Sequence, residues 1–81
     1  MMDSEFGRRF DEVVEDVVGV SGSFDDSDGP ATLEAWTSLA QIRLVNALET
    51  IFDVRLPDAA LLEEQTVGSL KRLVVEHRAQ T

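Results

Sequence analysis

The residue best placed to take part in a chemical reaction in this 81-residue chain is Ser38, which stands at the start of a strong helical pattern. The first N–H groups of a helix have no partner within it, and the N-terminal end of the helix dipole is positive. A negatively charged group on the Ser38 hydroxyl would therefore be stabilised there. Serine at such a position is otherwise an ordinary helix cap. Leu39, an apolar residue left on the exposed side of the helix, adds to the case that Ser38 carries an anionic modification.

Catalysis by the chain itself is poorly supported. A hydrolytic triad needs a base beside its nucleophile. The only histidine, His77, falls near the end of the last predicted helix. A cation is favourable at the C-terminal end of a helix dipole, so we interpret His77 as a helix-end residue. The chain has no cysteine, which excludes a disulfide, a zinc-thiolate site and a thiol nucleophile. We therefore predict no catalytic residue, no metal ligand and no enzymatic activity.

An acidic run that contains Asp26, Asp28 and Gly29 could suggest a calcium-binding loop. With Gly29 at the sixth position of such a loop, the two aspartates occupy the third and fifth positions correctly. Phe24 and Ala35 then stand at the first and twelfth positions, where oxygen ligands are needed. The run is therefore predicted to be a solvated turn.

A strong amphipathic helix is predicted from Ser38 to about Asp53. One half of its surface is apolar and is expected to face the core: Ile42, Leu44, Val45, Leu48, Ile51 and Phe52. The other half is polar: Arg43, Asn46, Glu49, Thr50 and Asp53. Leu39 is the exception, because it lies in the polar half, in line with Arg43, Asn46, Thr50 and Asp53. We predict that this exposed line, beside Ser38, is the surface that binds partner proteins.

Three further helices are expected to position the Ser38 helix. The first runs from about Ser4 to Val18, and Gly19 ends it. Its apolar residues share one face: Phe6, Phe10, Val13, Val14, Val17 and Val18. A short helix runs from Pro57 to about Leu62, since proline suits a first turn. The last helix follows Thr66 as its N-cap, with one face that is formed by Val67, Leu70, Leu73, Val74 and His77.

Residues 19–37 are rich in turn formers and make a long loop for so small a domain. Phe24, Leu33 and Trp36 give this loop apolar anchors, so an ordered course over the core is expected. Trp36 is predicted to clamp the end of the loop onto the core. No segment alternates as a strand would, and the prediction is one all-α domain over residues 1–81, a four-helix bundle with a long first loop and a short third helix.

Residues 36–57 closely resemble the acyl carrier protein family. Thr37-Ser38-Leu39 resembles the Asp-Ser-Leu attachment motif of that family, and Leu48 to Phe52 resembles its Leu-Glu-x-x-Phe run. Residues 66–70, Thr-Val-Gly-Ser-Leu, resemble the Thr-Val-x-x-Leu that opens the last helix of the family. The match is good over residues 36–74, whereas residues 1–35 match only by layout.

The resemblance implies that Ser38 receives 4′-phosphopantetheine from coenzyme A through a phosphopantetheinyl transferase. The terminal thiol of this arm then carries an acyl or aminoacyl thioester among loading and processing enzymes, which explains how a chain without cysteine could do thioester chemistry. The Trp-x-Ser-Leu start and the single-domain length look like those of discrete carriers from bacterial polyketide, nonribosomal peptide or related specialised pathways.

Two features depart from the family pattern. Thr37 stands where many members have aspartate. The exposed face of the second helix carries Arg43 and Asn46 where several acids are common, and the acidic charge is concentrated elsewhere: residues 1–36 hold ten acids and two bases, whereas residues 37–81 hold six acids and five bases. Docking by fatty-acid-synthase partners is therefore not implied.

The net charge of −9 argues against nucleic acid and anionic membrane as partners and favours basic proteins. Neither a signal peptide nor a membrane-spanning stretch is visible in the sequence, so we expect a soluble, cytoplasmic protein. We also expect a monomer. Two other functions stay open: a carrier-like interaction module that is not phosphopantetheinylated, and an acidic helical enzyme, against which the absence of a base and of metal ligands weighs.

Overall fold

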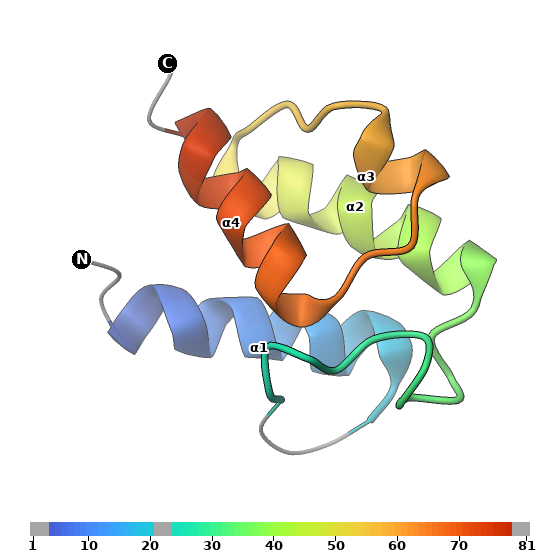
Figure 1. Cartoon of the computed structure of the whole chain (residues 1–81). Coiled ribbons are helices and arrows are strands. Elements are labelled where there is room, and N and C mark those ends of the chain that lie inside the picture. Colours follow the sequence, from blue (N-terminus) through green and yellow to red (C-terminus); the bar gives the residue numbers. More distant parts are fainter. Residues whose placement is uncertain (1–3, 21–23, 79–81) are drawn as a thin grey trace.

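Four helices follow one another along the chain, with no strand in the described ranges (Figure 1). The computed structural model describes residues 4–20 and 24–78. The helices are α1, Ser4–Val18; α2, Ser38–Phe52; α3, Ala59–Leu62; and α4, Val67–Arg78. The predicted all-α fold with a long first loop and a short third helix is confirmed. None of the described helices is long and apolar enough to cross a bilayer.

The helix α1 has the predicted bounds and the predicted inner face. Five of its six apolar residues are buried and Val17 is half-buried. Gly19 ends the helix with φ +82°, a left-handed conformation that glycine adopts without strain. The rings of Phe6 and Phe10 contact Phe52 of α2, at centroid distances of 5.0 and 6.4 Å. This aromatic cluster joins the start of α1 to the end of α2.

The inner face of α2 differs from the prediction at both isoleucines. Leu44, Val45, Leu48 and Phe52 are buried as expected, but Ile42 is 44% exposed and Ile51 43% exposed. Both side chains line grooves, Ile42 on the side of α3 and Ile51 on the side of α1. On a helical wheel the two isoleucines lie at opposite edges of the apolar half, so neither side chain points straight into the core.

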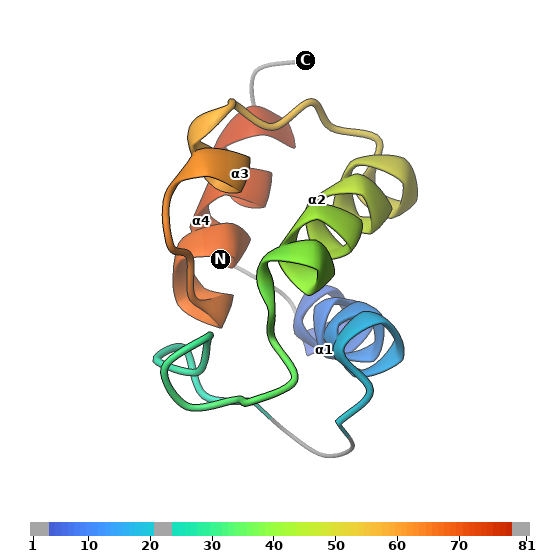
Figure 2. The same cartoon turned by 90° about the vertical axis from the view of Figure 1, so that its right-hand side faces the viewer.

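The loop between α1 and α2 runs across one end of the bundle, past the start of α4 (Figure 2). Its three apolar anchors pack as predicted: Phe24 and Trp36 are buried and Leu33 is half-buried. Residues 21–23 of the loop lie outside the described part of the chain.

The acidic turn is solvated only in part, because it docks on the start of α4: residues 25–27 are exposed, whereas Asp28 is half-buried and Gly29 is buried. The N–H groups of Val67 and Gly68 donate to the carbonyl oxygens of Asp28 and Asp26, at 2.8 and 2.9 Å. Lys71 Nζ lies 3.7 Å from Asp26 Oδ1. A Cβ atom on Gly68 would lie 2.7 Å from Asp26 Cβ, so only glycine permits this approach. The turn therefore fixes the loop to the N-terminus of α4.

The helices α3 and α4 follow the prediction with one shift of a boundary. Pro57 and Asp58 precede α3 in an i to i+3 turn, in which the Ala60 and Leu61 N–H groups donate to their carbonyl oxygens, and the helix itself starts at Ala59. Thr66 caps α4 as predicted, because its Oγ1 accepts from the Ser69 N–H at 3.2 Å. Val67, Leu70 and Val74 are fully buried, and Leu73 and His77 are half-buried.

Leu48→Ala tests the inner face of α2. The Leu48 side chain is fully buried, and its truncation should lower the free energy of unfolding by about 2–5 kcal/mol. That is a large part of the roughly 4–12 kcal/mol that a chain of this size has in total. Thr50→Ala, at an exposed position of the same helix, should change the free energy of unfolding by less than about 0.5 kcal/mol. Urea denaturation measures both, and a loss below about 1 kcal/mol for Leu48→Ala would contradict the packing described.

Candidate functional site

Ser38 is the first residue of α2, and its side chain is exposed. The capping role belongs to Thr37, whose Oγ1 accepts a hydrogen bond from the Ala40 N–H at 3.1 Å. The Ser38 hydroxyl makes no hydrogen bond within residues 4–20 and 24–78. Serine is therefore not required at this position for the cap, and its hydroxyl is available for modification.

The backbone around Ser38 offers unpaired donors. The first backbone hydrogen bond of the helix runs from the Gln41 N–H to the Thr37 carbonyl, at 2.9 Å. The Ala40 N–H is taken by the threonine cap. The N–H groups of Ser38 and Leu39 find no acceptor in the described part of the chain. Free N–H groups at the positive end of a helix dipole stabilise an anion, so this position suits a phosphodiester.

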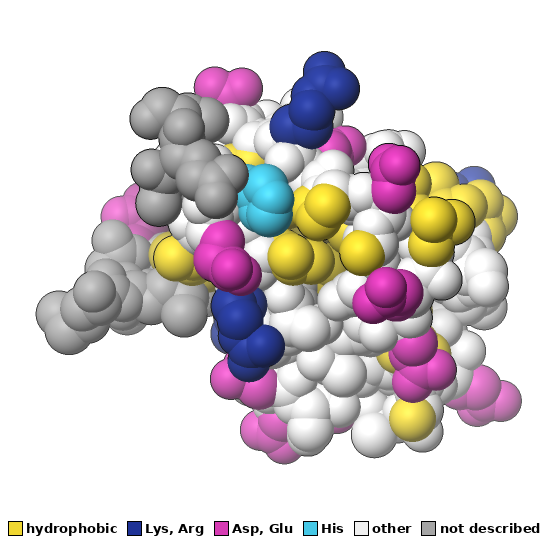
Figure 3. All heavy atoms as spheres, turned by 45° about the horizontal axis from the view of Figure 1, so that its top comes forward, with side chains coloured by type: hydrophobic (Ala, Val, Ile, Leu, Met, Phe, Trp, Pro, Cys, Tyr) yellow, Lys and Arg dark blue, Asp and Glu magenta, His cyan; other side chains and the backbone are white. Residues whose placement is uncertain are grey.

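A groove of about 430 Å³ lies beside Ser38, between the start of α2 and α3. Its lining contains these residues: Pro30, Trp36, Thr37, Ser38, Gln41, Ile42, Leu61, Leu62, Glu63 and Glu64. Three of the lining side chains are large, apolar and exposed: Ile42, Leu61 and, at 83%, Leu62. Figure 3 shows hydrophobic side chains at the surface among acidic ones on the face over α3 and α4. The groove can cover an apolar group with a polar end.

The side chain of Gln41 holds the walls of this groove together. The Trp36 Nε1–H donates to Gln41 Oε1 at 3.2 Å. The Gln41 Nε2 group donates to the carbonyl oxygens of Ala60 and Glu63, at 3.0 and 2.8 Å. One buried amide thus connects the end of the loop, the start of α2 and both ends of α3. The sequence prediction missed Gln41. The available signal was its place on the helical wheel, because this polar residue falls inside the apolar half, between Leu48 and Phe52.

The predicted partner surface is exposed along its whole length. Leu39, Arg43, Asn46, Thr50 and Asp53 all reach solvent. At the 1.5 Å rise of a helix, Asp53 lies roughly 21 Å along the axis from Leu39, so the structure does not bring the five residues together beside Ser38. Asp53 instead ends α2 in a left-handed conformation, with φ 54°.

The sequence prediction missed the apolar side chains on the α3 side of Ser38. Leu61 and Leu62 are not among the predicted site residues, and Ile42 is predicted to face the core. A single helical turn is too short for its periodicity to show which residues face inward, so the sequence holds no clear signal for the exposure of the two leucines.

The site fits a 4′-phosphopantetheine group. Ser38 supplies a free hydroxyl, and the N–H groups of Ser38 and Leu39 can meet the negative charge of a phosphodiester. The apolar walls of the groove can cover part of the arm. Among the described residues that line the groove there is no histidine, lysine or arginine, so these residues offer no cation or imidazole to activate the hydroxyl as a nucleophile.

A comparison with protein families bears on this site directly. Residues 8–74 match a family model described as a phosphopantetheine attachment site, which spans most of α1 and α4 and the whole of α2 and α3. No curated protein and no solved structure gives a match. Domains of this family carry 4′-phosphopantetheine covalently, and they are generally not catalytic. The chain therefore belongs to the phosphopantetheine-attachment family, that of the acyl carrier protein domains.

Proposed function

We propose that Ser38 is the attachment residue and that the chain works as a discrete acyl or aminoacyl carrier protein in a bacterial specialised pathway of polyketide, nonribosomal peptide or related type. The observation that supports this most is the combination at the start of α2. Ser38 has a free, exposed hydroxyl, while its neighbour Thr37 makes the cap. The family match covers this position.

The residues around Ser38 have separate roles in this proposal. Thr37 holds the first turn of α2, and the N–H groups of Ser38 and Leu39 stabilise the phosphodiester charge. Ile42, Leu61 and Leu62 offer the apolar surface along which the arm can lie. The group supplies a terminal thiol for thioester chemistry, which the cysteine-free chain lacks.

The threonine at position 37 is compatible with loading. Aspartate and threonine both cap helices well, so the first turn of α2 is kept with Thr37. A neutral cap also adds no negative charge beside a phosphodiester. Any contact that a carboxylate would make with the transferase must come from another residue of this chain.

The partners of a carrier domain are a phosphopantetheinyl transferase and acyl-processing enzymes in general. For this chain we further propose one domain over residues 1–81, a monomeric state and a cytoplasmic location. The net charge of −9 supports partners with basic docking surfaces.

Ser38→Ala tests the attachment residue. Incubation of the wild-type protein with coenzyme A and a broad-specificity phosphopantetheinyl transferase should add one phosphopantetheine group, which mass spectrometry of the intact protein detects. Ser38→Ala should abolish the addition, whereas Ser27→Ala, at an exposed position of the acidic turn, should leave it complete. Modification at another serine would contradict the assignment. A wild-type protein that several transferases leave unmodified would favour the interaction-module function instead.

Leu39→Ala tests the partner surface beside the arm. The Leu39 side chain is 56% exposed, so its truncation should leave the thermal midpoint nearly unchanged. Loss of an apolar contact at the centre of an interface should slow modification by the same transferase about fivefold, which corresponds to about 1 kcal/mol. The matched control is Val75→Ala, 40% exposed on α4, which should leave the rate unchanged. Unfolding of Leu39→Ala, or a rate equal to that of the control, would refute this surface.

A further inference from the structure

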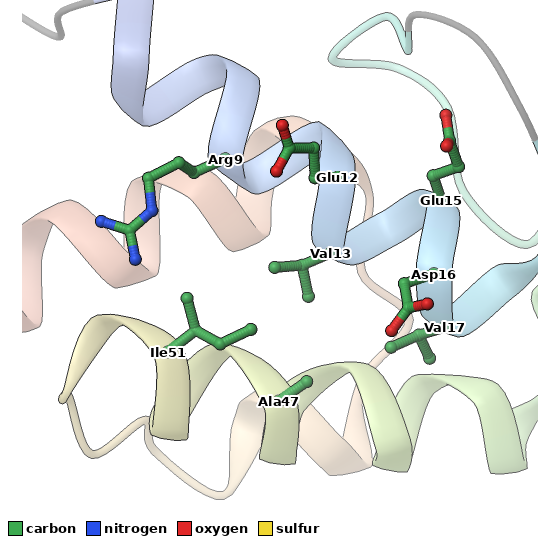
Figure 4. A pocket seen from close by; sticks show the side chains of 8 residues that line it. All are labelled: Arg9, Glu12, Val13, Glu15, Asp16, Val17, Ala47 and Ile51. Atoms are coloured by element: carbon green, nitrogen blue, oxygen red, sulfur yellow. The ribbon is translucent and has the colours of Figure 1, made fainter.

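A second groove, of about 650 Å³, lies between α1 and α2 (Figure 4). Four apolar side chains from the two helices line it: Val13, Val17, Ala47 and Ile51. In Figure 4 Ile51 and Ala47 extend from α2 toward Val13 and Val17 of α1. Val13 is buried, Val17 and Ala47 are half-buried, and Ile51 is 43% exposed. The groove therefore has an apolar floor with one exposed aliphatic side chain.

The rim of this groove is acidic along α1. Glu12 and Asp16 both line the groove, are exposed, and lie one helical turn apart. At the other end of the groove, the Arg9 guanidinium lies 5.3 Å from the centre of the Phe52 ring. Ten of the sixteen acids of the chain lie in residues 1–36. An apolar floor beside a row of acids is complementary to a surface with apolar and basic residues.

We infer that the groove between α1 and α2 binds a basic amphipathic helix of a partner protein. The apolar face of that helix packs on Ile51 and Ala47, and its lysines or arginines meet Glu12 and Asp16. A second copy of this chain does not fit as the occupant, because each copy carries a net charge of −9 and would bring further acids to an acidic rim.

The position of the groove indicates what kind of partner it binds. Ala47 and Ile51 follow Ser38 by nine and thirteen residues, which is roughly 14 and 20 Å along the axis of α2. The groove beside Ser38 shares no residue with this one. A helix bound between α1 and α2 would leave the modification site accessible. The role of the partner rests on the proposed function: the partner holds the carrier in place while other enzymes reach its arm.

A designed peptide tests the inference without any modification of Ser38. The probe is a fluorescein-labelled amphipathic helix with a leucine face flanked by lysines; the control peptide carries glutamate in place of each lysine. Fluorescence anisotropy at low salt should show saturable binding of the lysine peptide, which weakens as salt screens the charges, and none of the glutamate peptide. Absence of saturable binding, or equal binding of both peptides, would overturn the inference.

Variants then locate the binding site. Ile51→Ser and the double variant Glu12→Lys, Asp16→Lys should each weaken binding about tenfold or more. Matched controls on α4, Val75→Ser and Glu76→Lys, change similarly exposed residues outside the groove and should have little effect. The charge variants change exposed residues and should stay folded, so they still measure binding at the groove if Ile51→Ser is unstable. An equal loss of peptide affinity in the control variants would refute the assignment of the site to this groove.

A last measurement separates this groove from the site at Ser38. Addition of saturating lysine peptide should leave the rate of Ser38 modification by the transferase unchanged. Amide chemical shifts should change at Val13, Val17 and Ile51 and not at Leu62. Inhibition of modification, or shifts confined to α3, would place the peptide beside Ser38 and overturn the inference. If the peptide binds with the expected map of shifts but no transferase modifies the protein, the groove remains a site for a basic helix. That result would refute only the proposed carrier function and the role of the partner that rests on it.

Discussion

The fold around the modification site depends on the hydrogen bonds of one buried amide, that of Gln41, which is only 7% exposed. Its oxygen accepts from the Trp36 indole, and its nitrogen donates to the carbonyl oxygens of Ala60 and Glu63. A buried amide without partners is costly, roughly 1–3 kcal/mol by mutational data, so these three bonds are a constraint that the surrounding segments must satisfy together. They set the relative positions of the loop end, α2 and α3.

This constraint explains how a single helical turn can be a defined part of the structure. The helix α3 buries Ala60 but leaves Leu61 and Leu62 exposed, so apolar packing contributes little to its position. Polar side chains bind its backbone instead: Gln41 as described, and Gln65, whose Nε2 donates to the Ala59 carbonyl at 3.0 Å. Because the backbone of α3 is fixed in this way, its two leucines remain available as walls of the groove beside Ser38. The same bonds thus serve the fold and the site.

Local signals in the sequence predict most of the fold. Gly19 ends α1 and Thr66 caps α4 as expected, because glycine and threonine act on the backbone within a few residues of themselves. Ile42 and Ile51 lie at the two edges of the apolar half of the α2 wheel, and whether an edge residue is covered depends on tertiary contacts that the helical period does not give. Ser38 was recognisable from its motif, whereas the groove beside it arises from contacts of Gln41 across 19 and 22 residues of sequence.

Hydrogen exchange in Gln41→Met tests the central claim, that the Gln41 amide holds α3 in place. Methionine has a similar volume but cannot replace the three hydrogen bonds, so the protein should stay folded with a loss of about 1–3 kcal/mol. The N–H groups of Leu62 and Glu63, which donate to Asp58 and Ala59, should then exchange at least about tenfold faster relative to the N–H groups of α1. Unchanged protection of α3, or an equal increase in α1, would contradict the claim.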